Sequence, residues 1–114
     1  MARMLTETMK KGIASKYPVG SQDGKKSNAI CVVKFFFGNF TWYVTEASYE
    51  KDDFIMFGVV VTNRGAEFSF ISYNELQSLT WYGCQCVERD RYFKKCKLSE
   101  IKDDALQSFL KLID

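Results

Sequence analysis

Apolar positions near the start of the chain recur with the spacing of a helix. Leu5, Met9 and Ile13 are four residues apart, and lysines at positions 10 and 11 fall on the other side. This spacing gathers the apolar side chains on one face, so the pattern predicts an amphipathic helix over residues 4–15.

A polar stretch follows the predicted helix. Pro18 ends the helix, because the residue before a proline avoids the helical region. Residues 20–28 contain Ser, Gln, Asp, Gly and Lys and no apolar run. This composition predicts a loop, and we expect it to be the most flexible part of the molecule.

Two runs rich in aromatic and β-branched side chains come next, at 30–37 and 40–45. Only Gly38 and Asn39 separate them. A glycine in a two-residue connection supplies the positive φ that a tight hairpin turn needs. The pattern therefore predicts a β-hairpin.

The middle of the chain contains two more strand-like runs. Residues 54–62 are apolar on both faces, which is typical of a strand inside a sheet. Gly58 within this run predicts a bulge, or a neighbouring ring lying over the gap. A charged connection at 49–53 precedes the run, and a turn at 63–65 leads to a fourth strand at 67–71.

The last third of the chain predicts two helices and a short strand. Ser72 and Glu75 have the spacing of a capping box, so a short helix should run to about Leu79. Residues 84–91 alternate loosely, as an edge strand does. Ser99 is the predicted cap of a C-terminal helix. The apolar face of that helix is expected to contain Ile101, Ala105, Phe109 and Leu112, widened by Leu106, Leu110 and Ile113.

This order of elements predicts an α+β fold in one domain, residues 1–114. A chain of 114 residues and 13.2 kDa fits a single domain. The connections are short, so we expect a largely antiparallel sheet of four to five strands. An N-terminal helix, a short middle helix and a C-terminal amphipathic helix should cover at least one face of the sheet.

Composition and charge narrow the functional classes. A net charge of +2 disfavours both a strongly basic nucleic-acid binder and an acidic DNA mimic, although a local basic patch stays open. No apolar run approaches the roughly 20 residues that span a bilayer, so we expect no membrane association. The N-terminal residues show no signal-peptide pattern. We therefore expect a cytoplasmic protein with reduced cysteines.

Residues suited to metal or cofactor chemistry are few. The chain has no histidine, which removes Ser-His and Cys-His catalysis and the commonest metal ligand. No glycine-rich nucleotide motif occurs. Cys84 and Cys86, with Cys31 and Cys96, suggest a zinc site, but structural zinc usually takes two close pairs. We favour free thiols, and we expect no metal and no cofactor.

Carboxylates are the remaining candidates for acid–base catalysis, which needs two of them in one cleft. The set contains Glu46, Glu67, Glu75, Glu88 and Asp90. Structural roles are favoured, because the capping box accounts for Glu75 and an ion-pair cluster with Arg89 between its neighbours accounts for Glu88 and Asp90. We therefore do not expect an enzyme.

Two segments carry candidate binding residues. Basic residues crowd between positions 89 and 97 around two aromatic rings, a combination that suits phosphates and bases, although a solvated connection is the simpler reading. Trp81 and Tyr82 precede Gly83 in a predicted loop, where aromatics often anchor interfaces. Trp42 is expected in the core. The basic segment contains Arg89, Arg91, Tyr92, Phe93, Lys94, Lys95 and Lys97.

Five sequence blocks carry a resemblance to a known family: VKFF (33–36), TWYVTE (41–46), FG (57–58), SYNEL (72–76) and ERDRYF (88–93). In these blocks the chain resembles a small domain-of-unknown-function family carried by phages, plasmids and conjugative elements, from about residue 5 to residue 101. The resemblance implies a bacterial cytoplasm and a mobile-element setting. It implies no catalytic residues, because the family has no established activity.

Three functional hypotheses follow. The leading one is a non-enzymatic accessory protein of a mobile element that binds a host or element-encoded protein; interference with host defence is suggested by analogy only. The alternative is nucleic-acid binding through residues 89–97. The third is an enzyme that uses Glu46 or the carboxylates of Glu88 and Asp90.

Overall fold

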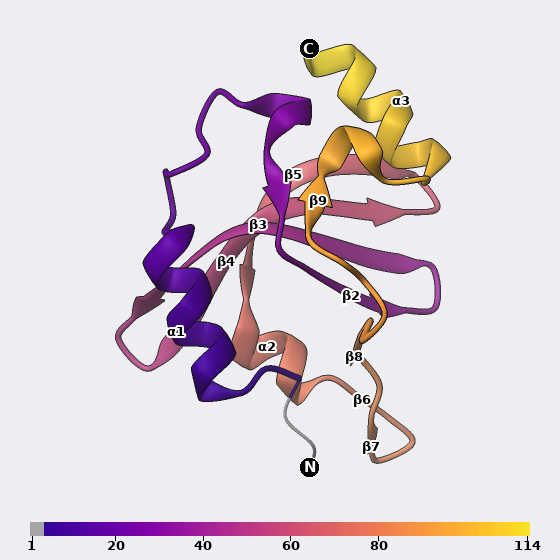
Figure 1. Cartoon of the computed structure of the whole chain (residues 1–114). Coiled ribbons are helices and arrows are strands. Elements are labelled where there is room, and N and C mark those ends of the chain that lie inside the picture. Colours follow the sequence, from indigo (N-terminus) through magenta and orange to yellow (C-terminus); the bar gives the residue numbers. More distant parts are fainter. Residues whose placement is uncertain (1–3) are drawn as a thin grey trace.

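The computed structural model describes residues 4–114; residues 1–3, which the predicted domain includes, lie outside them. Figure 1 shows a central sheet with α3 on one side and α1 and α2 on the other. The sheet has five antiparallel strands in the order β5-β4-β3-β2-β8. This arrangement confirms the predicted α+β fold and its antiparallel sheet.

The larger elements follow the predicted order. The helices are α1 (Glu7–Lys16), α2 (Tyr73–Ser78) and α3 (Asp104–Ile113). The strands of the sheet are β2 (Val33–Phe37), β3 (Phe40–Glu50), β4 (Asp53–Thr62), β5 (Gly65–Ser72) and β8 (Glu88–Arg89). Two strand pairs stand apart from it, β1 (Ile30–Cys31) with β9 (Cys96–Lys97), and β6 (Thr80–Trp81) with β7 (Cys84–Gln85).

The predicted hairpin is present, and its second strand is longer than expected. Phe37 and Phe40 are paired across a two-residue turn in which Gly38 has φ +55°. The ladder between β3 and β4 continues to the pair Glu50 and Asp53. The predicted charged connection at 49–53 is therefore wrong, since only two residues turn the chain there.

A β-bulge in β3 decides which side chains face which side of the sheet. The register shifts between Val44 and Glu46, opposite Gly58. A Cβ on Gly58 would lie 1.9 Å from the Tyr43 carbonyl oxygen, so glycine is required by the close approach of the β3 backbone. Side chains alternate between the two faces of the sheet, and the extra residue in the bulge shifts this alternation by one position. Ala47 therefore lies on the same face as Val44, whereas Glu46 points to the opposite face.

Both faces of the sheet are covered, each by its own hydrophobic core. The first core joins the sheet to α1 and α2 and includes Phe35, Trp42, Val44, Met56 and Leu76. The second core joins the sheet to α3 and includes Tyr43, Val59, Leu98, Leu106 and Leu110. Consecutive residues of β3 serve opposite cores because side chains alternate along a strand. Trp42 is buried, as predicted.

The N-terminal helix begins at Glu7, not at residue 4. Thr6 caps it by accepting a hydrogen bond from the Met9 N–H at 3.1 Å. Leu5 lies before the helix and is fully buried, and its N–H donates to the Tyr73 hydroxyl at 3.0 Å. Met9 and Ile13 pack against the first core, which confirms the predicted apolar face.

The middle helix has the predicted N-cap residue, Ser72, but a carboxylate other than that of Glu75 completes the cap. The Ser72 hydroxyl accepts from the Glu75 N–H at 3.1 Å. Among residues 4–114, the Glu75 carboxylate does not complete the capping box and is exposed. Asp53 supplies the carboxylate instead, accepting from the Ser72 hydroxyl and from the Asn74 N–H. The predicted role of Glu75 is therefore wrong.

The C-terminal helix is capped by Asp103, and the predicted cap at Ser99 is wrong. Ser99 lies in a short 3-10 turn, Leu98–Glu100, which directs Leu98 into the second core. The Asp103 carboxylate accepts from the Leu106 N–H at 3.2 Å and from the Tyr43 hydroxyl at 2.6 Å. Burial, followed by this hydrogen bond, raises the pKa of Tyr43 far above its ordinary value.

The buried stripe of α3 also differs from the prediction at one end. Leu106 and Leu110 are buried, and Phe109 and Ile113 pack beside them. Leu112 is 85% exposed, because a residue two positions after Leu110 falls on the opposite side of a helix.

The predicted edge strand at 84–91 is divided. Its first part pairs with β6 in a small separate hairpin, and its second part, β8, forms the sheet edge beside β2. None of the helices in the described part of the chain is long and apolar enough to cross a membrane.

Candidate functional site

The small hairpin β6–β7 carries two exposed aromatic side chains, Trp81 and Tyr82. Figure 1 shows it projecting from the molecule, away from α3. Trp81 is 61% exposed and Tyr82 is 90% exposed. The Trp81 ring lies 5.1 Å from the Tyr82 ring and 6.4 Å from the Phe37 ring, centroid to centroid. Both rings are therefore exposed, and Trp81 lies in a short strand where the sequence predicted a loop.

The turn of this hairpin holds Tyr82 in an unfavourable backbone conformation. Tyr82 has φ +53° and Gly83 has φ +78°, and both lie between the paired residues Trp81 and Cys84. Two-residue turns with two positive φ angles usually contain Asn-Gly. A side chain such as tyrosine costs roughly 1 kcal/mol there. Packing does not account for this choice, because the ring contact that Tyr82 makes in the described structure is with its exposed neighbour.

The aromatic surface continues onto the end of the central sheet. Phe37 contacts Trp81 and is paired with Phe40, which is exposed and stacks on Trp42 at 5.7 Å. We call Phe37, Phe40, Trp81 and Tyr82 the aromatic end. Phe37 and Phe40 were not among the predicted binding residues, although aromatic residues on both sides of a two-residue turn are visible in the sequence.

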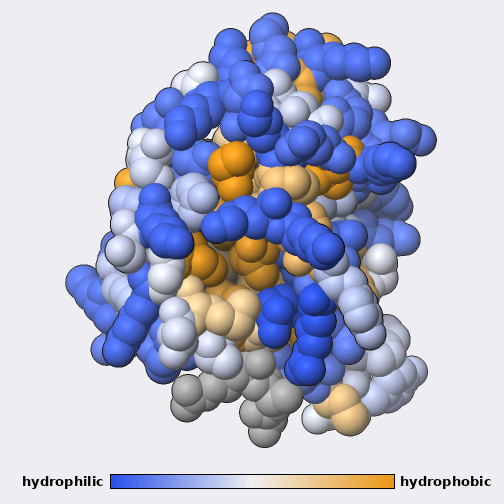
Figure 2. All heavy atoms as spheres, in the orientation of Figure 1, coloured by the Kyte–Doolittle hydropathy of each residue, from blue (hydrophilic) through white to orange (hydrophobic). Residues whose placement is uncertain are grey.

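The basic segment between β8 and β9 is also exposed. Arg91, Lys94 and Lys95 are solvent-exposed, and Tyr92 is 95% exposed. In Figure 1 this segment lies in front of the sheet, and Figure 2 shows a mostly hydrophilic surface on this side with apolar atoms in a central hollow. The basic side chains therefore lie on an exposed, mostly hydrophilic part of the surface.

The fold adds a lysine from the first helix to this segment and removes Arg89 from it. The Lys95 amine lies 5.4 Å from the centre of the Tyr17 ring, so the end of α1 with exposed Lys16 is adjacent. Arg89 is half-buried, and its Nε donates to the Met4 carbonyl at 2.9 Å. Arg89 therefore holds the N-terminal segment against the edge of the sheet, and it is less exposed than Arg91, Lys94 and Lys95.

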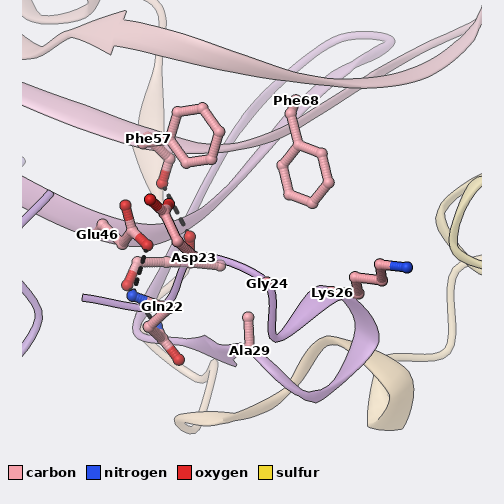
Figure 3. A pocket seen from close by; sticks show the side chains of 9 residues that line it. Gln22, Asp23, Gly24, Lys26, Ala29, Glu46, Phe57 and Phe68 are labelled. Carbon is pink, nitrogen blue, oxygen red and sulfur yellow. Dashed lines mark hydrogen bonds between the residues drawn. The ribbon is translucent and has the colours of Figure 1, made fainter. Parts of the chain in front are cut away.

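Glu46 is a buried carboxylate that holds the polar loop at 20–28. It accepts from the Gly20 N–H and from the Gln22 N–H, both at 2.8 Å, as Figure 3 illustrates for Gln22. Gln22 is buried too. Its side-chain NH₂ group donates to the Ile30 and Thr45 carbonyls, and its side-chain oxygen accepts from the Ile30 N–H. The loop that the sequence predicted to be most flexible is tied to the sheet.

A pocket of about 170 Å³ lies between this loop and two aromatic rings (Figure 3). Phe57 and Phe68 stack at 5.5 Å and form one wall. The Thr45 hydroxyl at its edge donates to the Phe57 carbonyl. In residues 4–114 every buried side-chain nitrogen or oxygen has a hydrogen-bond partner. The pocket therefore offers no unsatisfied buried polar group to a ligand.

The candidate catalytic carboxylates are not brought together. Glu46 lines the pocket, whereas Glu88 is exposed on the edge strand. Asp90 pairs with Lys34 at 3.5 Å and accepts from the Tyr92 N–H at 3.0 Å. The predicted ion-pair cluster around Arg89 is therefore wrong, because Lys34 is the partner of Asp90. This placement removes the geometric basis of the acid–base hypothesis.

The cysteines are divided between two places. Cys31 is buried and lies opposite Cys96 in the β1–β9 pair, whereas Cys84 and Cys86 lie in and after the β6–β7 hairpin. All four are free thiols. Burial raises the pKa of the Cys31 thiol far above its ordinary value, with Cys96 adding to the effect. Among residues 4–114, no three Cys, Asp or Glu side chains are placed to hold a metal ion.

Comparison with known proteins gives one match. The model of a family described as "Protein of unknown function (DUF2958)" matches residues 4–108. No curated protein matches the chain, and no solved structure does. The match covers most of the chain, including all of the central sheet and the aromatic end.

Proposed function

We propose that this chain, which belongs to the DUF2958 family of proteins of unknown function, acts by binding another protein through its aromatic end. The observation that carries the proposal is Tyr82, which is exposed at the tip of a hairpin in a conformation that disfavours its side chain. Strained positions concentrate at functional sites. Trp and Tyr are enriched among the residues that contribute most of the binding energy at protein interfaces.

The biological setting in this proposal comes from the resemblance to proteins of mobile elements. We place the protein in the bacterial cytoplasm, as a non-enzymatic accessory protein of such an element. Its partner is then a host protein or one encoded by the element. A component of host defence fits this setting by analogy.

A photo-crosslinking amino acid at position 82 tests the binding surface directly. Tyr82 is exposed and makes no hydrogen bond through its side chain among the described contacts, so its replacement should leave the fold intact. The matched control carries the same amino acid at position 112, because Leu112 is equally accessible but lies on α3. We expect cross-links in bacterial cells to one protein from position 82, removed by an excess of wild-type protein.

Two results would contradict the proposal. One is the same set of cross-linked proteins from positions 82 and 112, which would indicate collision rather than binding. The other is a position-82 product that the Trp81→Ala variant, added in excess, competes away as well as wild type does. Trp81 supports the Tyr82 ring, so its truncation should weaken competition about tenfold or more.

Nucleic-acid binding through the basic segment is the second candidate. It is favoured by the exposure of Arg91, Lys94 and Lys95 around exposed Tyr92, and by the proximity of Lys16. We would measure the mobility of labelled single- and double-stranded DNA and RNA at low and moderate salt. A shift that salt weakens and that glutamine at all three basic positions abolishes would support this function. A shift unaffected by the triple variant would exclude the segment.

A further inference from the structure

Strand β5 is a long sheet edge without the usual protection. It pairs with β4 from Thr62 and Gly65 to Ile55 and Ser72 with no shift in register. In the described residues no strand pairs with its other side, whereas the opposite edge of the sheet, β8, has only two residues. Natural edge strands are usually short, bulged, or protected by lysine or proline. Strand β5 has eight residues, no bulge, and neither lysine nor proline; its one charged residue is Glu67, and α3 packs on it through Phe109 against Phe68.

The same edge presents exposed aromatic surface. Phe68 stacks on Phe57 and makes an edge-to-face contact with Phe109 of α3 at 5.4 Å. Phe70 continues this row, with its ring 5.0 Å from Phe57, but it is 64% exposed. An apolar row therefore leads from the second core to the unpaired edge and stops there.

We propose that a second copy of this chain pairs antiparallel with β5, so that the two sheets become one continuous sheet. Antiparallel pairing of a strand with itself is two-fold symmetric, which is the commonest way for identical chains to associate. The free backbone N–H and C=O groups of the edge supply the hydrogen bonds.

The sequence of β5 is complementary to itself in this arrangement. With the two-fold axis beside Ser69, Phe68 lies opposite the partner's Phe70, and the aromatic row continues across the axis. Glu67, the only charged residue of the strand, lies opposite the partner's Ile71. The two Glu67 carboxylates therefore do not face each other, and no like charges oppose the pairing.

This association is independent of the proposed binding by the aromatic end. Strand β4 separates β5 from β3, which carries Phe40, and Phe37 lies one strand further away, in β2. A pair of chains joined at β5 keeps both aromatic ends accessible. The failure of either proposal therefore leaves the other standing.

Sedimentation equilibrium of the full chain, from micromolar to submillimolar concentration, tests the association. We expect the mass to rise from the 13.2 kDa of one chain to twice that value. Phe70→Lys places a charge on the exposed edge and should hold the protein at the mass of one chain. Tyr82→Asn is the matched control, since it changes an exposed aromatic residue elsewhere and should associate as wild type does.

The outcomes against the proposal are distinct. A wild-type chain that stays monomeric over the whole concentration range overturns the proposal. A Phe70→Lys variant that has the unfolding transition of wild type but still associates overturns it as well. If that variant does not fold, amide hydrogen exchange of wild type decides. Slower exchange in residues 65–72 at high concentration supports pairing at β5, and exchange independent of concentration overturns it.

Discussion

The loop at 20–28 and the β6–β7 hairpin contrast in a way that composition alone does not suggest. The loop is polar, yet Gln22 within it is buried and Glu46 binds two of its backbone N–H groups. The hairpin is aromatic, yet Trp81 and Tyr82 point into solvent. Polar residues are thus fixed in one region, and apolar residues are free in the other.

The difference lies in how many partners the fold supplies. Buried polar groups that are fully hydrogen-bonded hold one conformation, because leaving any of them unpaired costs free energy. The hairpin has two residues in each strand and is connected to the sheet through the ring contact between Phe37 and Trp81. Such a short hairpin contributes little to stability, so its aromatic residues are available for another task.

The largest expected effect is at Gly58, where the sheet meets the bulge that turns Glu46 toward the loop. Gly58→Ala puts a Cβ 1.9 Å from the Tyr43 carbonyl oxygen, and the backbone must shift to admit it. We expect the free energy of unfolding in denaturant to fall by about 3 kcal/mol or more.

The control for this change is Gly12→Ala in α1. A Cβ at Gly12 meets nothing within 4 Å, and alanine favours a helix. Stability should therefore rise by about 0.5–1 kcal/mol. Equal effects at Gly58 and Gly12 would contradict the close approach of β3 and β4.

Removal of the Glu46 carboxylate should have the next largest effect. Glu46→Ala leaves the Gly20 and Gln22 N–H groups without their acceptor, so we expect a loss of about 2–3 kcal/mol and faster proteolysis within residues 20–28. Glu88→Ala is the matched control, because Glu88 is exposed on the edge strand and should cost less than about 0.5 kcal/mol. If the loop were flexible, as its composition suggested, Glu46→Ala and Glu88→Ala would lower the free energy of unfolding by similar amounts.

Asp53 should give a smaller, pH-dependent effect. Burial alone raises the pKa of this carboxyl, but hydrogen bonds from the Ser72 hydroxyl and two backbone N–H groups hold the pKa below its ordinary value. The stabilisation is therefore complete above about pH 4 and is lost as the pH falls through the folded pKa. Asp53→Asn should cost about 1 kcal/mol at neutral pH, with the difference from wild type vanishing in acid.

Exposed Asp52 is the control for this measurement. Among the described hydrogen bonds its side chain makes none, so Asp52→Asn should match wild type at every pH. Thermal unfolding from pH 2 to pH 7 checks both variants. A cost of Asp53→Asn that persists below the folded pKa would contradict the role of the charge.

The smallest effect on stability is expected at Tyr82, together with the largest effect on binding. Asparagine adopts a positive φ at a lower free-energy cost than tyrosine does. This gain in stability offsets the loss of the ring contact with Trp81. Tyr82→Asn should therefore change the free energy of unfolding by less than about 1 kcal/mol. Its affinity for the partner captured at position 82 should fall about tenfold or more. A stability loss comparable to that of Glu46→Ala would make Tyr82 a structural residue.

Local features of the chain were predictable from the sequence. The Gly38–Asn39 turn, the apolar run of β4, the Ser72 cap and the apolar spacing of α1 each depend on neighbouring residues, and the structure confirms them. The glycine turn beside Trp81 and Tyr82 was also visible, whereas the exposure of the two rings came from the structure. Together the local signals were sufficient for the α+β fold.

Contacts between distant segments were decided only by the tertiary structure. Asp53 replaces Glu75 at the cap of α2, Lys34 replaces Arg89 as the partner of Asp90, and Glu46 holds a loop more than twenty residues away. In each case several side chains of the right chemistry are available along the chain. Which of them pair depends on the register of the sheet and on the bulge opposite Gly58, because one inserted residue exchanges the faces of a strand.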